Sequence, residues 1–216
     1  KSMKKTFLGT GIALTLLSVA LPKQSQETLT KSGLNPTNYE TIVDGVKPVK
    51  LYTLKNAAGM EVCVTNFGGR IVSIMVPDKT ETKRCSAGFD SIADYQNIPS
   101  DFGASIGRYA NRINKGVIVM DGETIQLPQN KFWSLPDGGP KGWQYQVYGS
   151  KPIKRTVLMT LTMKSPDGDA IFPGNVTATV TYALTRDNAI DNKITKRQLT
   201  KKTVIKYDQP LLFQLE

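Results

Sequence analysis

Two arginines and an asparagine stand out among small and apolar residues in the stretch 102–113, which reads FGASIGRYANRI. Arg108 and Arg112 lie four positions apart, and Asn111 directly precedes the second arginine. Guanidinium and amide groups together supply several hydrogen-bond donors in fixed directions, which suits the hydroxyl groups of a sugar. The same arginines can instead close local ion pairs, and composition alone favours that second interpretation.

The chain contains no histidine among its 216 residues. Histidine is the usual proton shuttle near neutral pH, so acid–base chemistry would fall to carboxylates, lysine, tyrosine or cysteine. The sequence has no serine nucleophile elbow, no phosphate-binding loop and no metal-ligand spacing. Asp167 and Asp169 flank Gly168, and a turn accounts for that pair. We expect neither a metal nor a cofactor.

Cys63 and Cys85 are the only cysteines. Cys63 lies in the alternating apolar stretch 62–64, so we expect a buried thiol, although pairing with Cys85 stays open. Two cysteines without a histidine cannot supply the usual four zinc ligands.

Residues 1–20 have the features of an export signal. Three lysines within the first five residues precede an uncharged, mostly apolar run over 7–20, which is short for a membrane span. Ser18 and Ala20 offer the small side chains that a signal peptidase reads. A lipoprotein would carry its lipidated cysteine at the next position, which is Leu21. We therefore expect a periplasmic or extracellular protein without a membrane anchor.

The formal charge is +10, and much of the excess lies between positions 186 and 206. A basic cluster can bind phosphates or polyanions, but it more often forms a solvated face. No aromatic residue interleaves with this cluster to stack on bases, so we expect no nucleic-acid partner. A β-protein that binds polyanions through this cluster is one functional hypothesis.

The elements that must position these residues are short runs rich in β-branched side chains. The runs 51–54, 61–65 and 70–76 are separated by turn residues, a pattern typical of successive strands. The clearest hairpin covers 116–127, because its central Asp-Gly pair supplies the positive φ angles of a tight turn.

Further strands are predicted over 156–164 and 175–184, and no helical periodicity appears outside the leader. Residues 21–49 are polar and punctuated by prolines, so they are interpreted as a linker or loosely packed lead-in. Many short strands with one apolar face must stack in two layers, which predicts a large antiparallel β-sandwich over 50–216.

Eight short motifs occur in a shared order and spacing. Residues 66–73 read NFGGRIVS, and residues 103–113 read GASIGRYANRI. Together with six others they resemble the aldose 1-epimerase (galactose mutarotase) family from about Leu51 to Leu215. The other six are GFDS with a following DY (88–95), DG (121–122), QLP (126–128), GGPKG (138–142), SPDG (165–168) and FPGN (172–175).

The resemblance implies an all-β fold, a large antiparallel β-sandwich of the galactose mutarotase type that is truncated at the C-terminus. It also implies interconversion of the α and β anomers of hexoses such as galactose and glucose, a reaction of carbohydrate metabolism without a cofactor. In the family, a histidine protonates the ring oxygen and a glutamate near the C-terminus takes the proton of the anomeric hydroxyl group. A second histidine helps to hold the sugar.

Compared position by position, the family's sugar-holding asparagine and arginine are Asn111 and Arg112. The sugar-holding histidine falls on Asp137, the acid histidine falls on Pro210, and the chain ends at Glu216 before the segment with the base. The resemblance therefore implies that no catalytic residue is intact. Whether these departures mark a natural pseudoenzyme, a truncation or an artificial sequence stays open.

The resemblance leads to two further functional hypotheses. The first is an inactive member of the aldose 1-epimerase family, and the alternative is a non-catalytic carbohydrate-binding β-sandwich protein. In both cases the expected partner is a hexose, bound weakly. Closing strands absent from the sheets would leave edges exposed, which favours self-association.

Overall fold

A computed structural model describes residues 28–45, 47–79, 82–84, 88–129, 134–135, 137–151, 157–198 and 202–209. The expected export signal, Cys85, Pro210 and Glu216 lie outside these ranges. Within them, no helix combines the length and the apolar character needed to cross a membrane.

The first sheet contains the three strands expected between positions 51 and 76. It is antiparallel and has the order β3-β4-β5-β6. All five residues of β4 are buried, because layers cover both faces of this sheet. Its strands are β3 (Leu51–Lys55), β4 (Glu61–Thr65), β5 (Arg70–Pro77) and β6 (Thr82–Arg84).

The second sheet is antiparallel in the order β11-β12-β13-β14. Every second residue of β13 is buried, from Val176 to Leu184, as a strand with one face on a core requires. The sequence did not indicate β14, since its nine residues are mostly polar and only Ile190 and Ile194 are apolar. The strands are β11 (Gly149–Lys151), β12 (Leu158–Ser165), β13 (Val176–Leu184) and β14 (Ile190–Gln198).

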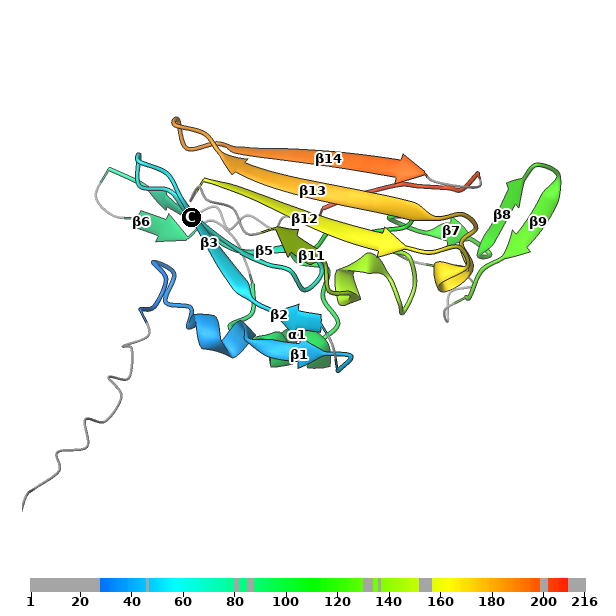
Figure 1. Cartoon of the computed structure of the whole chain (residues 1–216), viewed down its shortest axis with the longest axis horizontal. Coiled ribbons are helices and arrows are strands. Elements are labelled where there is room, and N and C mark those ends of the chain that lie inside the picture. Colours follow the sequence, from blue (N-terminus) through cyan, green and yellow to red (C-terminus); the bar gives the residue numbers. More distant parts are fainter. Residues whose placement is uncertain are drawn as a thin grey trace, which may run out of the picture.

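The two sheets pack face to face and form the predicted β-sandwich (Figure 1). Apolar side chains of both sheets meet in one core, which also holds Trp143 and Tyr148 from the segment between the sheets. The strand residues of this core include Val62, Val64, Ile71 and Ile74 on one side and Met159, Leu161, Met163, Ala178, Val180 and Tyr182 on the other.

A third layer covers the outer face of the first sheet. It consists of a 3₁₀ helix η1 (Pro36–Tyr39), the hairpin of β1 (Thr41–Val43) and β2 (Lys47–Val49), and the helix α1 (Ile92–Asn97). Leu34, Tyr39 and Val49 are buried there against Cys63, which is a buried free thiol as predicted. Part of the segment expected as a lead-in therefore contacts the first sheet through these buried side chains, although most of its residues are exposed.

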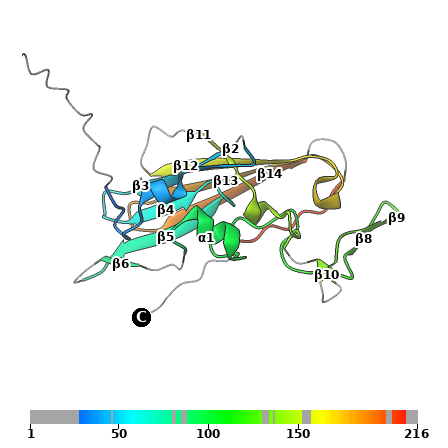
Figure 2. The ribbon, with the colours of Figure 1, turned by 90° about the horizontal axis from the view of Figure 1, so that it is seen from below.

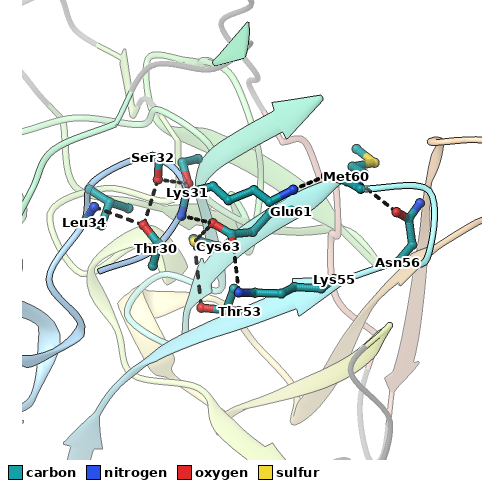
Figure 3. Close-up of polar contacts among 12 residues, drawn as sticks. Thr30, Lys31, Ser32, Leu34, Thr53, Lys55, Asn56, Met60, Glu61 and Cys63 are labelled. Carbon is teal, nitrogen blue, oxygen red and sulfur yellow. Dashed lines mark hydrogen bonds and ion pairs between the residues drawn. The ribbon is translucent and has the colours of Figure 1, made fainter. Parts of the chain in front are cut away.

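The buried carboxylate of Glu61 ties this N-terminal segment to the sheet (Figure 3). Its Oε1 atom accepts the N–H of Lys31 at 2.6 Å, and its Oε2 atom lies 3.0 Å from Nζ of Lys55. The hydroxyl of Ser32 donates to that of Ser73 at 2.9 Å. The polar N-terminal segment packs because Glu61 and Ser73 of the sheet provide hydrogen-bond partners for it, which composition does not reveal.

The helix α1 is the one α-helix among the described residues. Ser91 caps it, because its hydroxyl oxygen accepts the N–H of Asp94 at 3.1 Å. Serine followed three positions later by an acidic residue is a helix-start signal. The motif at 88–95 includes this stretch, but no helix was expected there, because one turn and a half is too short to show a helical periodicity.

The predicted Asp-Gly hairpin is confirmed as β8 (Val117–Met120) and β9 (Glu123–Gln126), which stand off at one end of the molecule (Figure 2). Asp121 and Gly122 have φ angles of 55° and 86°. Near its base, β7 (Ile113–Asn114) pairs with β10 (Ser134–Leu135). Two short 3₁₀ helices, η2 (Trp143–Tyr145) and η3 (Asp169–Ile171), complete the described elements.

Candidate functional site

The stretch 106–111 lies between two segments that are distant in sequence. On one side, the N–H of Ile106 donates to the carbonyl of Asp208 at 2.9 Å, and that of Ala110 donates to Lys206 at 2.7 Å. On the other side, the N–H of Trp143 donates to the carbonyl of Gly107 at 3.0 Å. The stretch therefore contacts both the segment that follows position 137 and the segment that precedes position 210.

Glycines allow this close approach. A Cβ atom on Gly138, which has a φ of +77°, would lie 2.1 Å from the carbonyl oxygen of Gly107. A Cβ atom on Gly107 would lie 2.2 Å from the ring of Trp143. Any larger residue at these two positions would force the site segments apart.

Asn111 and Asp137 form a reciprocal pair. The N–H of Asn111 donates to Oδ1 of Asp137 at 2.7 Å, and the N–H of Asp137 donates to the carbonyl of Asn111 at 3.3 Å. Both residues have positive φ angles, 70° and 48°, which aspartate and asparagine tolerate better than most residues. The amide oxygen of Asn111 accepts the N–H of Arg112 at 2.7 Å.

Asn111 and Arg112 are exposed, and Asp137 is half-buried beside them. Within the described ranges, no side chain pairs with the guanidinium group of Arg112. The three positions that the sequence selected are thus brought together on one surface. Pro210, the fourth position, lies outside the described residues.

Arg108 has a different role from Arg112, because it is only 2% exposed. Its guanidinium group donates to Oγ of Ser165 and to the carbonyls of five residues at the connection between β12 and β13: Ser165, Pro166, Phe172, Pro173 and Gly174. Burial lowers its pKa, and the carboxylates of Asp169 and Asp167 oppose that shift. The ion pairs among the described residues, Lys55 with Glu61 and Lys202 with Asp121, involve neither arginine.

Sequence reasoning missed a second buried arginine, Arg70. Its guanidinium group donates to the carbonyls of Ser100, Phe102 and Gln144 at 3.0–3.2 Å and stacks 4.2 Å from the ring centre of Tyr95. Arg70 thereby joins the first sheet to the segment that leads into 106–111 and to the segment around Trp143. An arginine that starts an apolar strand could have been recognised as a buried charge.

A tyrosine network fixes the segment 202–209. The hydroxyl of Tyr207 donates to Oγ of Ser105 at 2.9 Å, and that of Tyr182 donates to the carbonyl of Gly69 at 2.7 Å. Gln209 donates to the hydroxyl of Tyr182 and to the carbonyl of Gly103. Burial raises the pKa of Tyr182 to about 12 and raises the pKa of Tyr207 still further.

The surface around Asn111 offers hydrogen-bond donors and acceptors and no imidazole. In the part of the chain that the structure describes, no cluster of three or more acidic, cysteine or histidine side chains could hold a metal ion. The arrangement can hold a polyhydroxy ligand, and the acidic side chain beside Asn111 is that of Asp137.

Comparison with known proteins places the chain beside sugar epimerases. The family model described as aldose 1-epimerase matches residues 50–207. The aldose 1-epimerase of Escherichia coli K12 is 39% identical over 148 residues, which cover 67% of this chain and 42% of that enzyme. Human galactose mutarotase is 31% identical over 134 residues, or 62% of this chain and 39% of the human protein. The chain therefore spans less than half the length of these relatives.

Solved structures show the same fold. The galactose 1-epimerase of Lactobacillus acidophilus superimposes with a TM-score of 0.73 at 25% identity, covering 82% of this chain and 52% of that one. A GalM/aldose epimerase homologue from C. elegans gives a TM-score of 0.74 at 21% identity, covering 78% and 51%.

Proposed function

The chain belongs to the aldose 1-epimerase family, and we propose that it binds a hexose at Asn111, Arg112 and Asp137 without interconverting the anomers of the sugar. Galactose and glucose are the proposed ligands. The observation that carries this proposal is the reciprocal pair of Asn111 and Asp137, which keeps the sugar-holding surface assembled although no histidine is present.

Weak binding is expected from the chemistry of this surface. Arg112 contributes hydrogen-bond donors, and Asp137 contributes acceptors, although one of its oxygens already accepts the N–H of Asn111. All three side chains lie at or near the surface, where water competes for each hydrogen bond. A dissociation constant of about 1 mM or weaker follows.

The absence of catalysis follows from the groups that the reaction needs. Anomer exchange requires one group to protonate the ring oxygen and another to take the proton of the anomeric hydroxyl, each worth roughly a hundred- to ten-thousand-fold in rate. Proline at position 210 carries no side-chain proton to transfer, and position 137 carries an aspartate already engaged by Asn111.

Polarimetry of α-galactose and α-glucose tests the proposal directly. We expect the protein to leave the rate of anomer exchange at its value in buffer. Acceleration well above buffer by the unchanged protein would refute the inactive assignment and make Asp137 or Asp208 the candidate acid.

Binding is measured separately, by following amide resonances of the ¹⁵N-labelled protein while galactose is added. Shifts should concentrate around Asn111, and Arg112→Lys should weaken them, since lysine lacks the planar fork of donors. Sorbitol at the same concentrations serves as the control for non-specific effects of polyols. A uniform response to both compounds would argue against a sugar site.

A further inference from the structure

Gln144 is a buried polar side chain just beyond the GGPKG motif of residues 138–142. It lies in η2, is 2% exposed, and follows Trp143, which packs in the core between the sheets. Its main-chain carbonyl accepts a hydrogen bond from Arg70 at 3.0 Å. The main chain of Gln144 is therefore fixed to the first sheet.

The amide group of Gln144 reaches the loop 137–142, at the end that carries Asp137. Its Nε2 atom donates to the main-chain carbonyl of Asp137 at 2.9 Å. Gly142 makes room for this contact, because a Cβ atom there would lie 2.3 Å from Oε1 of Gln144 and 2.5 Å from the carbonyl oxygen of Asp137. The buried amide thus holds the start of the loop from the inside.

Asp137 connects Gln144 to the sugar-holding surface. Its N–H group and its Oδ1 atom form the reciprocal pair with Asn111, while its carbonyl accepts the amide of Gln144. The φ angle of Asp137 is 48°, a conformation that persists in residues other than glycine only where surrounding contacts hold it. Gln144 supplies such a contact from the buried side.

The other end of the Gln144 amide destabilises the folded protein. Among the described residues no donor reaches its buried Oε1 atom. An unsatisfied buried acceptor costs free energy of folding, which an apolar side chain of similar size would avoid. Stability alone therefore does not favour glutamine at this position, whereas a bond to the carbonyl of Asp137 requires a donor.

We infer that Gln144 is a positioning residue for hexose binding, which holds the carbonyl of Asp137 and thereby keeps Asn111 in the arrangement that binds the sugar. This inference rests on the proposed function. Gln144 is buried behind the loop, so it acts on the sugar through Asp137 and not by direct contact.

A second contact of the same side chain has to be separated from this one. Burial raises the pKa of Tyr145, and a side-chain hydrogen bond with Gln144 opposes that rise. Tyr145→Phe removes the hydroxyl group and retains the bond between Gln144 and Asp137. This variant should therefore bind galactose as the unchanged protein does.

Positioning is tested first without sugar, through the amide resonance of Asn111 in the ¹⁵N-labelled protein. Gln144→Met removes the donor to Asp137, so the Asn111 amide should shift and exchange faster with solvent. Gln146→Met is the matched control, because Nε2 of Gln146 donates to the carbonyl of Lys141 in the same loop. This control should leave the Asn111 amide unchanged. An equal response to both substitutions, or a response to neither, would overturn the inference.

Galactose then tests the role in binding. Gln144→Met should weaken galactose binding roughly fivefold, and Gln146→Met should leave it unchanged. The urea midpoint of Gln144→Met should stay close to that of the unchanged protein, because the variant loses an unsatisfied acceptor together with the donor. A lower midpoint with unchanged affinity would show a purely structural role and overturn the inference. An equal loss of affinity in Tyr145→Phe would overturn it as well.

The possible failures are distinguishable. If galactose binds equally well to the unchanged protein and to Gln144→Met, the inference is wrong and the proposed function stands. If galactose shifts no resonance in any variant, both are wrong.

Discussion

The two arginines of the GRYANR stretch show how residues of one type, four positions apart, acquire opposite roles. The side chain of Arg108 points into the protein, where the connection between β12 and β13 surrounds it with carbonyl oxygens. Arg112 follows Asn111, whose φ of 70° redirects the chain, and its side chain is exposed. The first arginine therefore organises loops, and the second is available to a ligand.

Substituting each arginine by lysine should separate these roles. Arg108→Lys keeps the charge but loses the planar fork that serves several carbonyls, so we expect a loss of about 2–3 kcal/mol in the free energy of unfolding. Arg112→Lys is the matched control, and it should stay within about 0.5 kcal/mol of the unchanged protein. Urea denaturation measures both, and equal stabilities for the two variants would contradict the assignment.

At the scale of elements, the segment 202–209 is attached to the sandwich through both its main chain and its side chains. Two isolated bridges join it to 106–109, Tyr207 donates to Ser105, and Gln209 donates to the hydroxyl of Tyr182 on β13. These hydroxyls lie in the core, where a phenolate would be poorly solvated. The attachment of this segment therefore depends on neutral tyrosines.

Stability should consequently fall in alkaline solution. The pKa of Tyr182 is raised from 10.0 to about 12, so the folded state holds the proton more tightly than the unfolded state. The contribution is complete below about pH 10 and is lost as the pH rises toward about 12, by roughly 2–3 kcal/mol for this one group.

Urea denaturation between about pH 8 and about pH 12 measures the alkaline effect. Tyr182→Phe should be about 1 kcal/mol less stable at the lower end, because it lacks the bond to Gly69, and should show a shallower alkaline decline. An unchanged slope in this variant would show that Tyr182 does not carry the effect.

At the scale of the whole molecule, the second sheet ends at β14, which lies along one side of the sandwich (Figure 1). Within the described residues, β14 pairs with β13 alone. Exposed edge strands tend to pair with other chains, and charged side chains, of which β14 carries four, weaken that tendency. We propose that this edge is where copies of the chain associate.

Sedimentation velocity over a range of protein concentrations tests self-association. The apparent mass should rise with concentration, and Thr195→Lys should reduce that rise by adding charge to the exposed middle of β14. Gln96→Lys adds the same charge on the exposed side of α1 and should have no such effect. A monomer at every concentration would refute the proposal.

The sequence by itself determined the strands whose side chains alternate and the turns between them. β3, β4, β5, β12 and β13 lie where β-branched runs predicted them, and the Asp-Gly hairpin is where two residues of positive φ were expected. These features are local, because a strand's pattern and a turn's φ angles depend on neighbouring residues. The motifs in register determined the family, and with it the β-sandwich.

Only the tertiary structure decided the features that depend on residues distant in the chain. The polar segment 28–34 packs because Glu61, about thirty positions later, is a buried acceptor for it. Arg108 is structural because the connection between β12 and β13 brings carbonyl oxygens to it. Burial and hydrogen-bond partners of this kind arise from packing, which a local pattern does not encode.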